Sequence, residues 1–102
     1  MAILYVTEFA AQGQDARGWK MVVADLPPAA EQTVAIGAGS VQSSAFNPLT
    51  KFVRLATDVT CSVSLGVNPT AAATSMRMAA NSAEYFSVPL GQSWKVAVIT
   101  NT

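Results

Sequence analysis

Apolar and polar residues alternate most clearly over residues 52–66, FVRLATDVTCSVSLG. From Val53 to Leu65 every odd position is apolar except Thr57, and the even positions from Arg54 to Ser64 are polar or small. A strand places successive side chains on opposite faces, so this alternation predicts a long β-ribbon with one buried and one solvated face. Residues 56–58 interrupt the alternation, and there the ribbon is expected to bend or turn.

Shorter segments of the same character occur on both sides of this ribbon. The other expected strands are residues 2–9, 19–24, 32–36, 41–46, 76–80, 84–88 and 93–100. Glycine, proline and asparagine separate them: residues 10–18 and 66–75 are expected to be surface loops, and Gly91 offers a positive φ angle. Residues 27–31 could hold one helical turn, but no segment predicts a full helix. About eight short strands predict one all-β domain over residues 1–102, a β-sandwich wound as an antiparallel jelly roll.

The composition indicates a surface that is covered in the working state. The chain has 102 residues, of which 51% are apolar and only 12% charged, well below the roughly 25% that is usual. Six basic and six acidic residues give no net charge, which argues against nucleic acid or an anionic membrane as the partner. Few charges also protect a monomer poorly against self-association. We therefore expect a homo-oligomer or a complex with a larger assembly.

The residues that carry chemistry are sparse. There is no histidine, so the most frequent general base and zinc ligand is missing, and a small cupin-like enzyme is disfavoured. Cys61 lies on the apolar parity and is expected to be a buried small hydrophobe. Asp58 is interpreted as a carboxylate that stabilises a turn by accepting backbone N–H groups. The sequence predicts no enzyme, cofactor or metal, and it shows neither a secretion signal nor a membrane span.

Surface aromatic residues are the remaining candidates for recognition. Most aromatic residues are expected in the core, but Trp19 follows a polar, glycine-containing loop, which favours contact with another protein. A carbohydrate- or receptor-binding module with Trp19 and Tyr85 as stacking platforms is the alternative. The candidate protein-interface residues are Tyr5, Trp19, Met21, Phe46, Asn68 and Thr70.

Residues 51–99 also carry a resemblance to a known group of proteins. Its features are the ribbon RLATD, the loop NPT, the element ANSAEYF and the closing strand KVAVI. They resemble short proteins encoded among tailed-phage structural genes, some of which are capsid cement, or decoration, proteins. The resemblance implies a jelly-roll dimer that clamps neighbouring major capsid subunits on the outside of the head, made in the host bacterial cytoplasm.

The resemblance covers only the second half of the chain. The first half, including AAQGQDARGWK, gives no independent match, so the surface that faces the shell is not identified from sequence. A head, tail or adhesin component of the same virion stays open, and so does a carbohydrate- or receptor-binding module of a tail or head fibre.

Overall fold

Ten β-strands make up all the regular structure in the part of the chain that the computed structural model describes, residues 2–14, 16–17, 20–24 and 28–101. They are β1 (Ile3–Phe9), β2 (Gln12–Gln14), β3 (Lys20–Ala24), β4 (Ala30–Ala35), β5 (Val41–Gln42), β6 (Phe52–Thr57), β7 (Cys61–Gly66), β8 (Met76–Met78), β9 (Ser82–Ser87) and β10 (Lys95–Thr100). The described residues contain no helix, so the predicted all-β class is confirmed.

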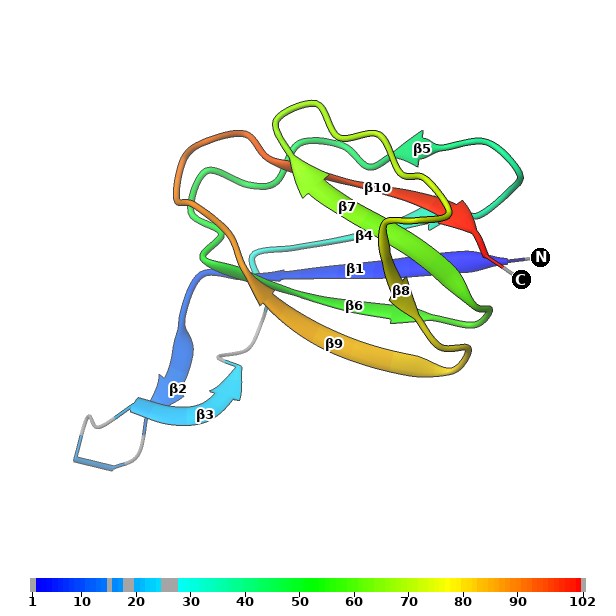
Figure 1. Ribbon diagram of the computed structural model, residues 1–102. Coiled ribbons are helices and arrows are strands. Elements are labelled where there is room, and N and C mark those ends of the chain that lie inside the picture. Colours follow the sequence, from blue (N-terminus) through cyan, green and yellow to red (C-terminus); the bar gives the residue numbers. More distant parts are fainter. Residues whose placement is uncertain (1, 15, 18–19, 25–27, 102) are drawn as a thin grey trace.

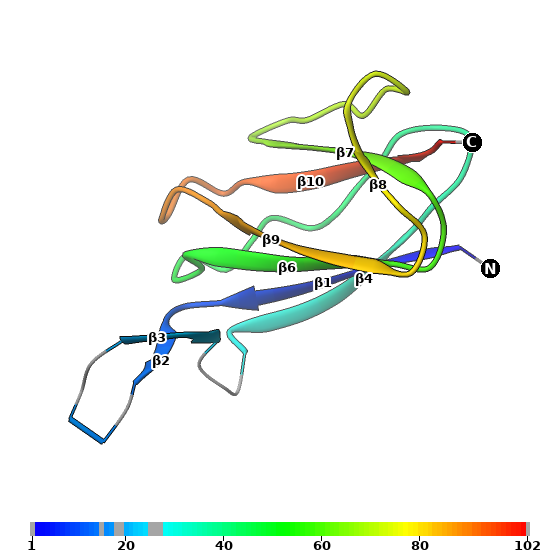
Figure 2. The same cartoon turned by 60° about the horizontal axis from the view of Figure 1, so that its bottom comes forward.

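Eight of these strands form two antiparallel sheets that face each other (Figure 1). Sheet I has the order β4-β1-β6-β9, and sheet II has the order β5-β10-β7-β8. From β4 onward, every connection except β7 to β8 passes from one sheet to the other, which is the winding of a jelly roll. β1 begins and β10 ends at the same end of the sandwich (Figure 2). The predicted β-sandwich of about eight antiparallel strands is therefore confirmed.

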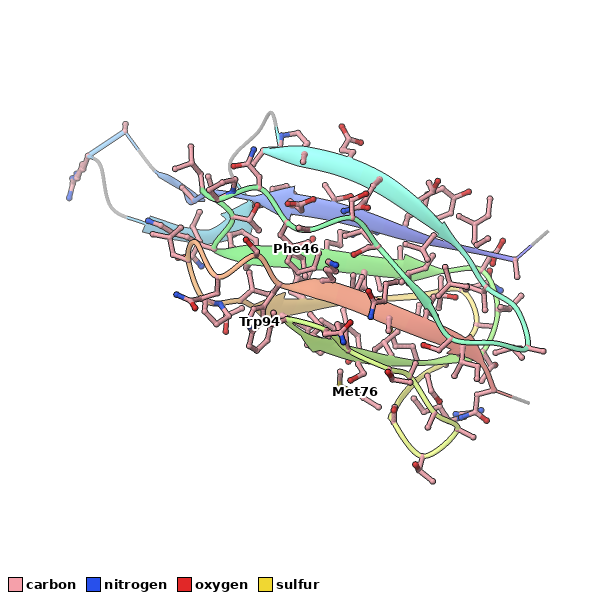
Figure 3. All side chains as sticks on the ribbon, turned by 90° about the horizontal axis from the view of Figure 1, so that it is seen from above. Phe46, Met76 and Trp94 are labelled. Atoms are coloured by element: carbon pink, nitrogen blue, oxygen red, sulfur yellow. The ribbon has the colours of Figure 1, made fainter. Side chains whose placement is uncertain are left out.

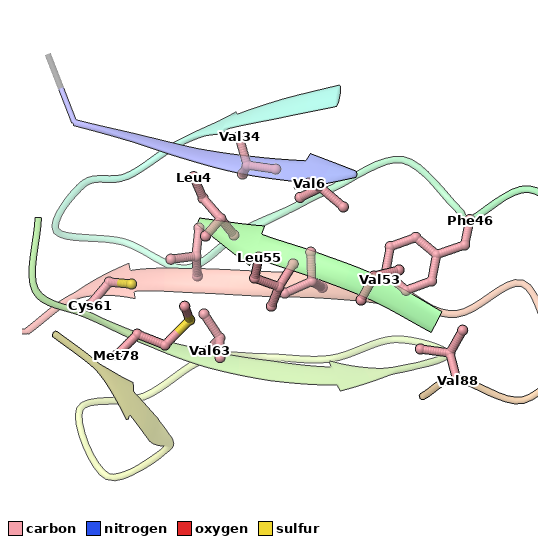
Figure 4. Packing of buried hydrophobic residues seen from close by; sticks show 12 residues of the cluster. Leu4, Val6, Val34, Phe46, Val53, Leu55, Cys61, Val63, Met78 and Val88 are labelled. Carbon is pink, nitrogen blue, oxygen red and sulfur yellow. The ribbon is translucent and has the colours of Figure 1, made fainter. Parts of the chain in front are cut away.

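The core lies between the two sheets and follows the alternation in the sequence (Figure 4). Leu4 and Leu55 from sheet I and Val63 from sheet II are at most 1% exposed. The remaining buried members of this cluster are Val6, Val34, Phe46, Val53, Cys61, Met78, Val88, Val96 and Val98. Interdigitation of two inner faces in this way is what fills a sandwich core about 10 Å thick.

The predicted ribbon over residues 52–66 consists of two strands that belong to different sheets. β6 ends at Thr57 and β7 begins at Cys61, so the expected bend is a complete change of sheet. The hydroxyl of Thr57, the one polar residue on the inward parity, donates to the Val59 carbonyl at 2.6 Å and accepts from the Val59 N–H at 3.2 Å. Asp58 Oδ1 accepts the Ile3 N–H at 2.9 Å, so Asp58 is a backbone acceptor as predicted, but the donor lies in β1 and not in the turn that the prediction assigned to it.

The outer face of sheet II is covered around Ser62, contrary to the sequence prediction that this residue is solvated. Residues 67–75 fold back over this face, and Ser62 is fully buried. Asn101 Nδ2 donates to Ser62 Oγ at 2.7 Å and to the Ala73 carbonyl at 3.2 Å, and Gln42 Nε2 donates to Asn68 Oδ1 at 2.9 Å. Alternation identifies the side of a strand on which a residue lies, but a loop can cover that side.

Two further segments differ from the sequence interpretation. The sequence predicts a loop over residues 10–18, but β2 pairs with β3 through Gln12–Ala24 and Gln14–Lys20, with an irregular register between them. This two-stranded arm extends beyond the end of sheet I (Figures 1 and 2). No helical turn occupies the described part of residues 27–31, because β4 begins at Ala30. A short strand such as β2, with the sequence QGQ, has the same polar, glycine-containing composition as a loop, so composition does not distinguish the two.

Candidate interaction surface

The outer faces of the two sheets differ in what covers them. Residues 67–75 cover part of sheet II, whereas the outer face of sheet I carries exposed side chains on β4, β1 and β9 and half-buried ones on β6. Two rows run across it from β4 to β9, and they are Thr33–Tyr5–Ala56–Ala83 and Glu31–Thr7–Arg54–Tyr85. Tyr5 is 47% exposed and Tyr85 is 59% exposed. Sheet I therefore offers an accessible surface with two tyrosines and few charges.

Three aromatic rings cross this outer face near the base of the arm. Phe9 stacks on Phe52 with ring centroids 5.1 Å apart, and Phe52 meets Tyr85 at 6.3 Å with the rings tilted by 46°. Exposure rises along this aromatic row, from 4% at Phe9 to 59% at Tyr85. Aromatic pairs with this spacing contribute about 0.5–1.5 kcal/mol beyond their buried area.

A hollow of about 360 Å³ lies where the aromatic row meets the arm. We call it the Tyr85 hollow, and its lining residues are Ala11, Gln12, Lys51, Phe52, Tyr85, Phe86 and Ser87. A second hollow of about 340 Å³ lies beside Tyr5 and Arg54 on the same face. Concave, mostly apolar sites with a few polar groups are typical of binding surfaces.

The structure does not bring the six predicted interface residues together. Tyr5 lies on the outer face of sheet I, and Met21 lies in β3 of the arm. Asn68 and Thr70 are exposed in the segment that covers sheet II, on the opposite side of the sandwich. Trp19 lies outside the described residues.

Phe46 has to be removed from the interface candidates. Its side chain is only 5% exposed and belongs to the core, where it lies beside Trp94 (Figure 3). The Phe46 N–H donates to the Trp94 carbonyl at 2.8 Å, which fixes this segment along the start of β10. The sequence interpretation missed Lys51 and Arg54 as surface candidates, although Arg54 lies on the polar parity of the ribbon.

The described residues hold no group of side chains that could bind a metal ion. No cluster of three or more histidine, cysteine, aspartate or glutamate residues could hold an ion in this part of the chain. Glu8 is 1% exposed, and its carboxylate accepts hydrogen bonds from the Asn47 N–H at 2.6 Å, from Thr50 Oγ1 at 2.8 Å and from Gln32 Nε2 at 3.2 Å. Its contacts are those of a structural group. No helix among the described residues is long and apolar enough to cross a membrane.

Cys61 is fully buried, as the sequence predicted, and burial raises the pKa of its thiol, with a hydrogen bond to Thr57 opposing this and Asp58 adding to it. In the folded protein we expect a thiol reagent such as a disulfide dye to label Cys61 more than about tenfold more slowly than in the denatured chain. Because the pKa is raised, the thiol stays protonated at mildly alkaline pH, where an exposed thiol would ionise. Stopped-flow absorbance measures both rates. Thr70→Cys in a Cys61→Ser background is the control and should react at once, whereas fast labelling of native Cys61 would contradict its burial.

β9 is an edge strand of sheet I, and a charge protects it. Glu84 is exposed, although it pairs with the fully buried Leu55 and so lies on the inward parity of the strand. A charged residue on the inward parity of an edge strand discourages another strand from extending the sheet. The six-residue edge of β9 would otherwise offer unpaired backbone groups to a second molecule.

We therefore expect Glu84→Val to increase self-association. Removal of the charge lets two β9 edges pair, so the weight-average mass at a fixed micromolar concentration should rise above that of the unmodified protein. Sedimentation velocity measures this. Glu84→Lys is the matched control, since it keeps a charge at the edge and should behave like the parent protein. Equal association of both variants would show that the charge of Glu84 does not protect the edge.

Comparison with known proteins identified no relative of this chain. No protein-family model matches the chain, and no match was found among curated proteins or solved structures.

Proposed function

We propose that this chain is a structural virion protein, a capsid cement protein that binds the outside of a tailed-phage head and stabilises contacts between major capsid subunits. The observation that carries the proposal is the uncovered outer face of sheet I, with the arm extending beside it. The resemblance of residues 51–99 to small phage structural proteins supports the same assignment. In this role the protein acts by adding contacts to the shell and performs no catalysis, and it works as a homo-oligomer, with a dimer favoured.

The size of sheet I limits how it can bind. Four strands about 4.8 Å apart and six residues long, at about 3.3 Å per residue, span roughly 400 Å². A specific interface needs about 800 Å² on each partner. The sheet face alone is therefore too small, and the arm has to add contacts. Many copies on one shell would then raise modest single-site affinities through effective concentration.

Binding to heads is the direct test. Heads assembled from the major capsid protein of the same phage, without this chain, are mixed with the purified protein and sedimented. We expect saturable co-sedimentation, weakened by Tyr5→Ala and by Arg54→Ala on the outer face of sheet I. Val67→Ala, an exposed position in the segment over sheet II, is the control and should bind normally. Absence of co-sedimentation at any concentration would exclude the cement function.

Oligomeric state tests the second part of the proposal. Sedimentation equilibrium at micromolar concentration should give a mass at or above that of a dimer. A strictly monomeric protein would remove the dimer from the proposal but would leave binding to heads open.

A carbohydrate- or receptor-binding module is the second candidate, favoured by the exposure of Tyr85 beside a hollow. A sugar ring can stack on such an aromatic face. A glycan array with hits that Tyr85→Ala abolishes would establish this function, and an array without hits would remove glycan binding.

A further inference from the structure

We propose that the Tyr85 hollow binds an aromatic side chain of a partner protein whose neighbouring group is a carboxylate. Taking the partner to be a protein rests on the proposed function, whereas the binding chemistry follows from the residues that form the hollow.

The walls of the hollow are held in place by backbone hydrogen bonds. The Lys51 N–H donates to the Phe9 carbonyl at 2.8 Å, and the Val88 N–H donates to the Lys51 carbonyl at 2.9 Å. These bonds join the end of β1, the start of β6 and the end of β9 at one point. A site that is fixed before binding loses little conformational entropy when a ligand enters.

The aromatic row gives the hollow its preference for a ring. Phe9, Phe52 and Tyr85 are spaced at 5.1 and 6.3 Å, and the row ends at the exposed Tyr85 with no further ring on it among the described residues. A ring entering the hollow would continue the row and cover Phe52 and Tyr85. The volume of about 360 Å³ is at the small end of the range of ligand sites, which suits one side chain.

Lys51 gives the hollow its preference for a negative charge. Its side chain is exposed and forms no ion pair with a described residue. None of the residues that line the hollow is acidic. Glu84, although next to Tyr85 in sequence, lies on the opposite parity of β9, and Arg54 adds a second cation on the outer face beside Tyr85. A carboxylate next to the bound ring therefore meets positive charge and no opposing carboxylate.

Other ligands that stack on tyrosine match the two features of the hollow, the aromatic row and the positive charge, less well. A neutral sugar leaves Lys51 without a charged partner. A nucleic acid offers rings and phosphates, but a chain without net charge provides little long-range attraction for such a polymer. A protein segment with an aromatic residue next to an acidic residue, or at a chain end, satisfies both features.

The test is an NMR titration of the ¹⁵N-labelled full chain with N-acetyl-L-tryptophan, which has an indole ring and a carboxylate. We expect saturable shifts at Gln12, Lys51 and Ser87 with a Kd on the order of 1 mM. N-acetyl-L-tryptophanamide has the same ring without the carboxylate and should bind about two- to fivefold more weakly, the range of one exposed ion pair.

Three variants separate ring binding from charge recognition. Tyr85→Ala should weaken the binding of N-acetyl-L-tryptophan about tenfold, because it removes the end of the aromatic row. Lys51→Met should abolish the difference between the acid and the amide, which a purely structural role would not do. Val67→Ala should leave both affinities unchanged.

Several outcomes would overturn the proposal. The first is the absence of saturable shifts with N-acetyl-L-tryptophan up to ~20 mM, 20-fold above the expected Kd. The second is equal binding of N-acetyl-L-tryptophan and N-acetyl-L-tryptophanamide by the parent chain. The third is tighter binding of methyl glucoside or AMP at the same residues. If the protein binds heads but not N-acetyl-L-tryptophan, the proposal for the Tyr85 hollow is wrong and the cement function stands. If the protein binds N-acetyl-L-tryptophan but not heads, the cement function is wrong and the proposal for the Tyr85 hollow stands.

Discussion

Val63→Asp is expected to leave the chain unfolded at neutral pH. Val63 is 1% exposed in the centre of β7 and packs against the inward residues of sheet I. An aspartate there would bury an unpaired charge, which costs several kcal/mol, against a total stability of roughly 5–15 kcal/mol for a domain. Far-ultraviolet circular dichroism should show loss of the β-sheet spectrum. Val96→Asp on β10 should have the same effect, since Val96 is fully buried.

Two controls place the same substitution at other levels of burial. Thr33→Asp on the exposed face of β4 should fold, with a small loss of stability. Ser62→Asp lies on the polar parity of β7 but beneath the covering segment, so it should be strongly destabilised, because it buries a charge and places it against the Ala73 carbonyl to which Ser62 Oγ donates at 3.4 Å. Similar denaturation midpoints for Val63→Asp and Thr33→Asp would contradict the assignment of inner and outer faces.

Glu8→Ala is expected to lower the free energy of unfolding by about 2–6 kcal/mol, the range for leaving two polar groups without a hydrogen-bond partner. The carboxylate accepts hydrogen bonds from Gln32, Asn47 and Thr50, and no described side chain is left as a buried unsatisfied group. Its removal leaves the Asn47 N–H and the Thr50 hydroxyl without this acceptor, whereas Gln32 Nε2 still donates to the Ser44 carbonyl at 3.3 Å. Each unsatisfied group costs about 1–3 kcal/mol. Urea denaturation monitored by tryptophan fluorescence measures the change.

Glu8→Gln is the matched control for this prediction. Its carbonyl can still accept from Asn47 and Thr50, but its amide nitrogen meets the Gln32 amide, so it should lose less stability than the alanine variant. If the carboxylate contributed only through its volume, Glu8→Gln would be as stable as the parent protein, because glutamine has nearly the same volume. The same network fixes the turn before Lys51, because the Thr50 N–H donates to the Asn47 carbonyl at 2.9 Å. Glu8→Ala should therefore also disturb the Tyr85 hollow.

The sequence by itself determined the local features of this protein. The alternation from Val53 to Leu65 assigned the inward residues of β6 and β7 correctly, because a strand of either sheet points every second side chain into the same core. The sequence also predicted the turn at Gly91. The φ angle of Gly91 is 72°, which glycine adopts without strain. The all-β class and the sandwich followed from these patterns.

The tertiary structure alone decided which distant segments meet. Neither the burial of Ser62 beneath residues 67–75 nor the placement of Phe46 in the core is encoded in a local pattern. The Tyr85 hollow likewise joins the end of β1, the arm, the start of β6 and the end of β9. The physical reason is that alternation specifies a side of a strand, whereas the order of strands and the covering of a face depend on packing between residues far apart in the chain.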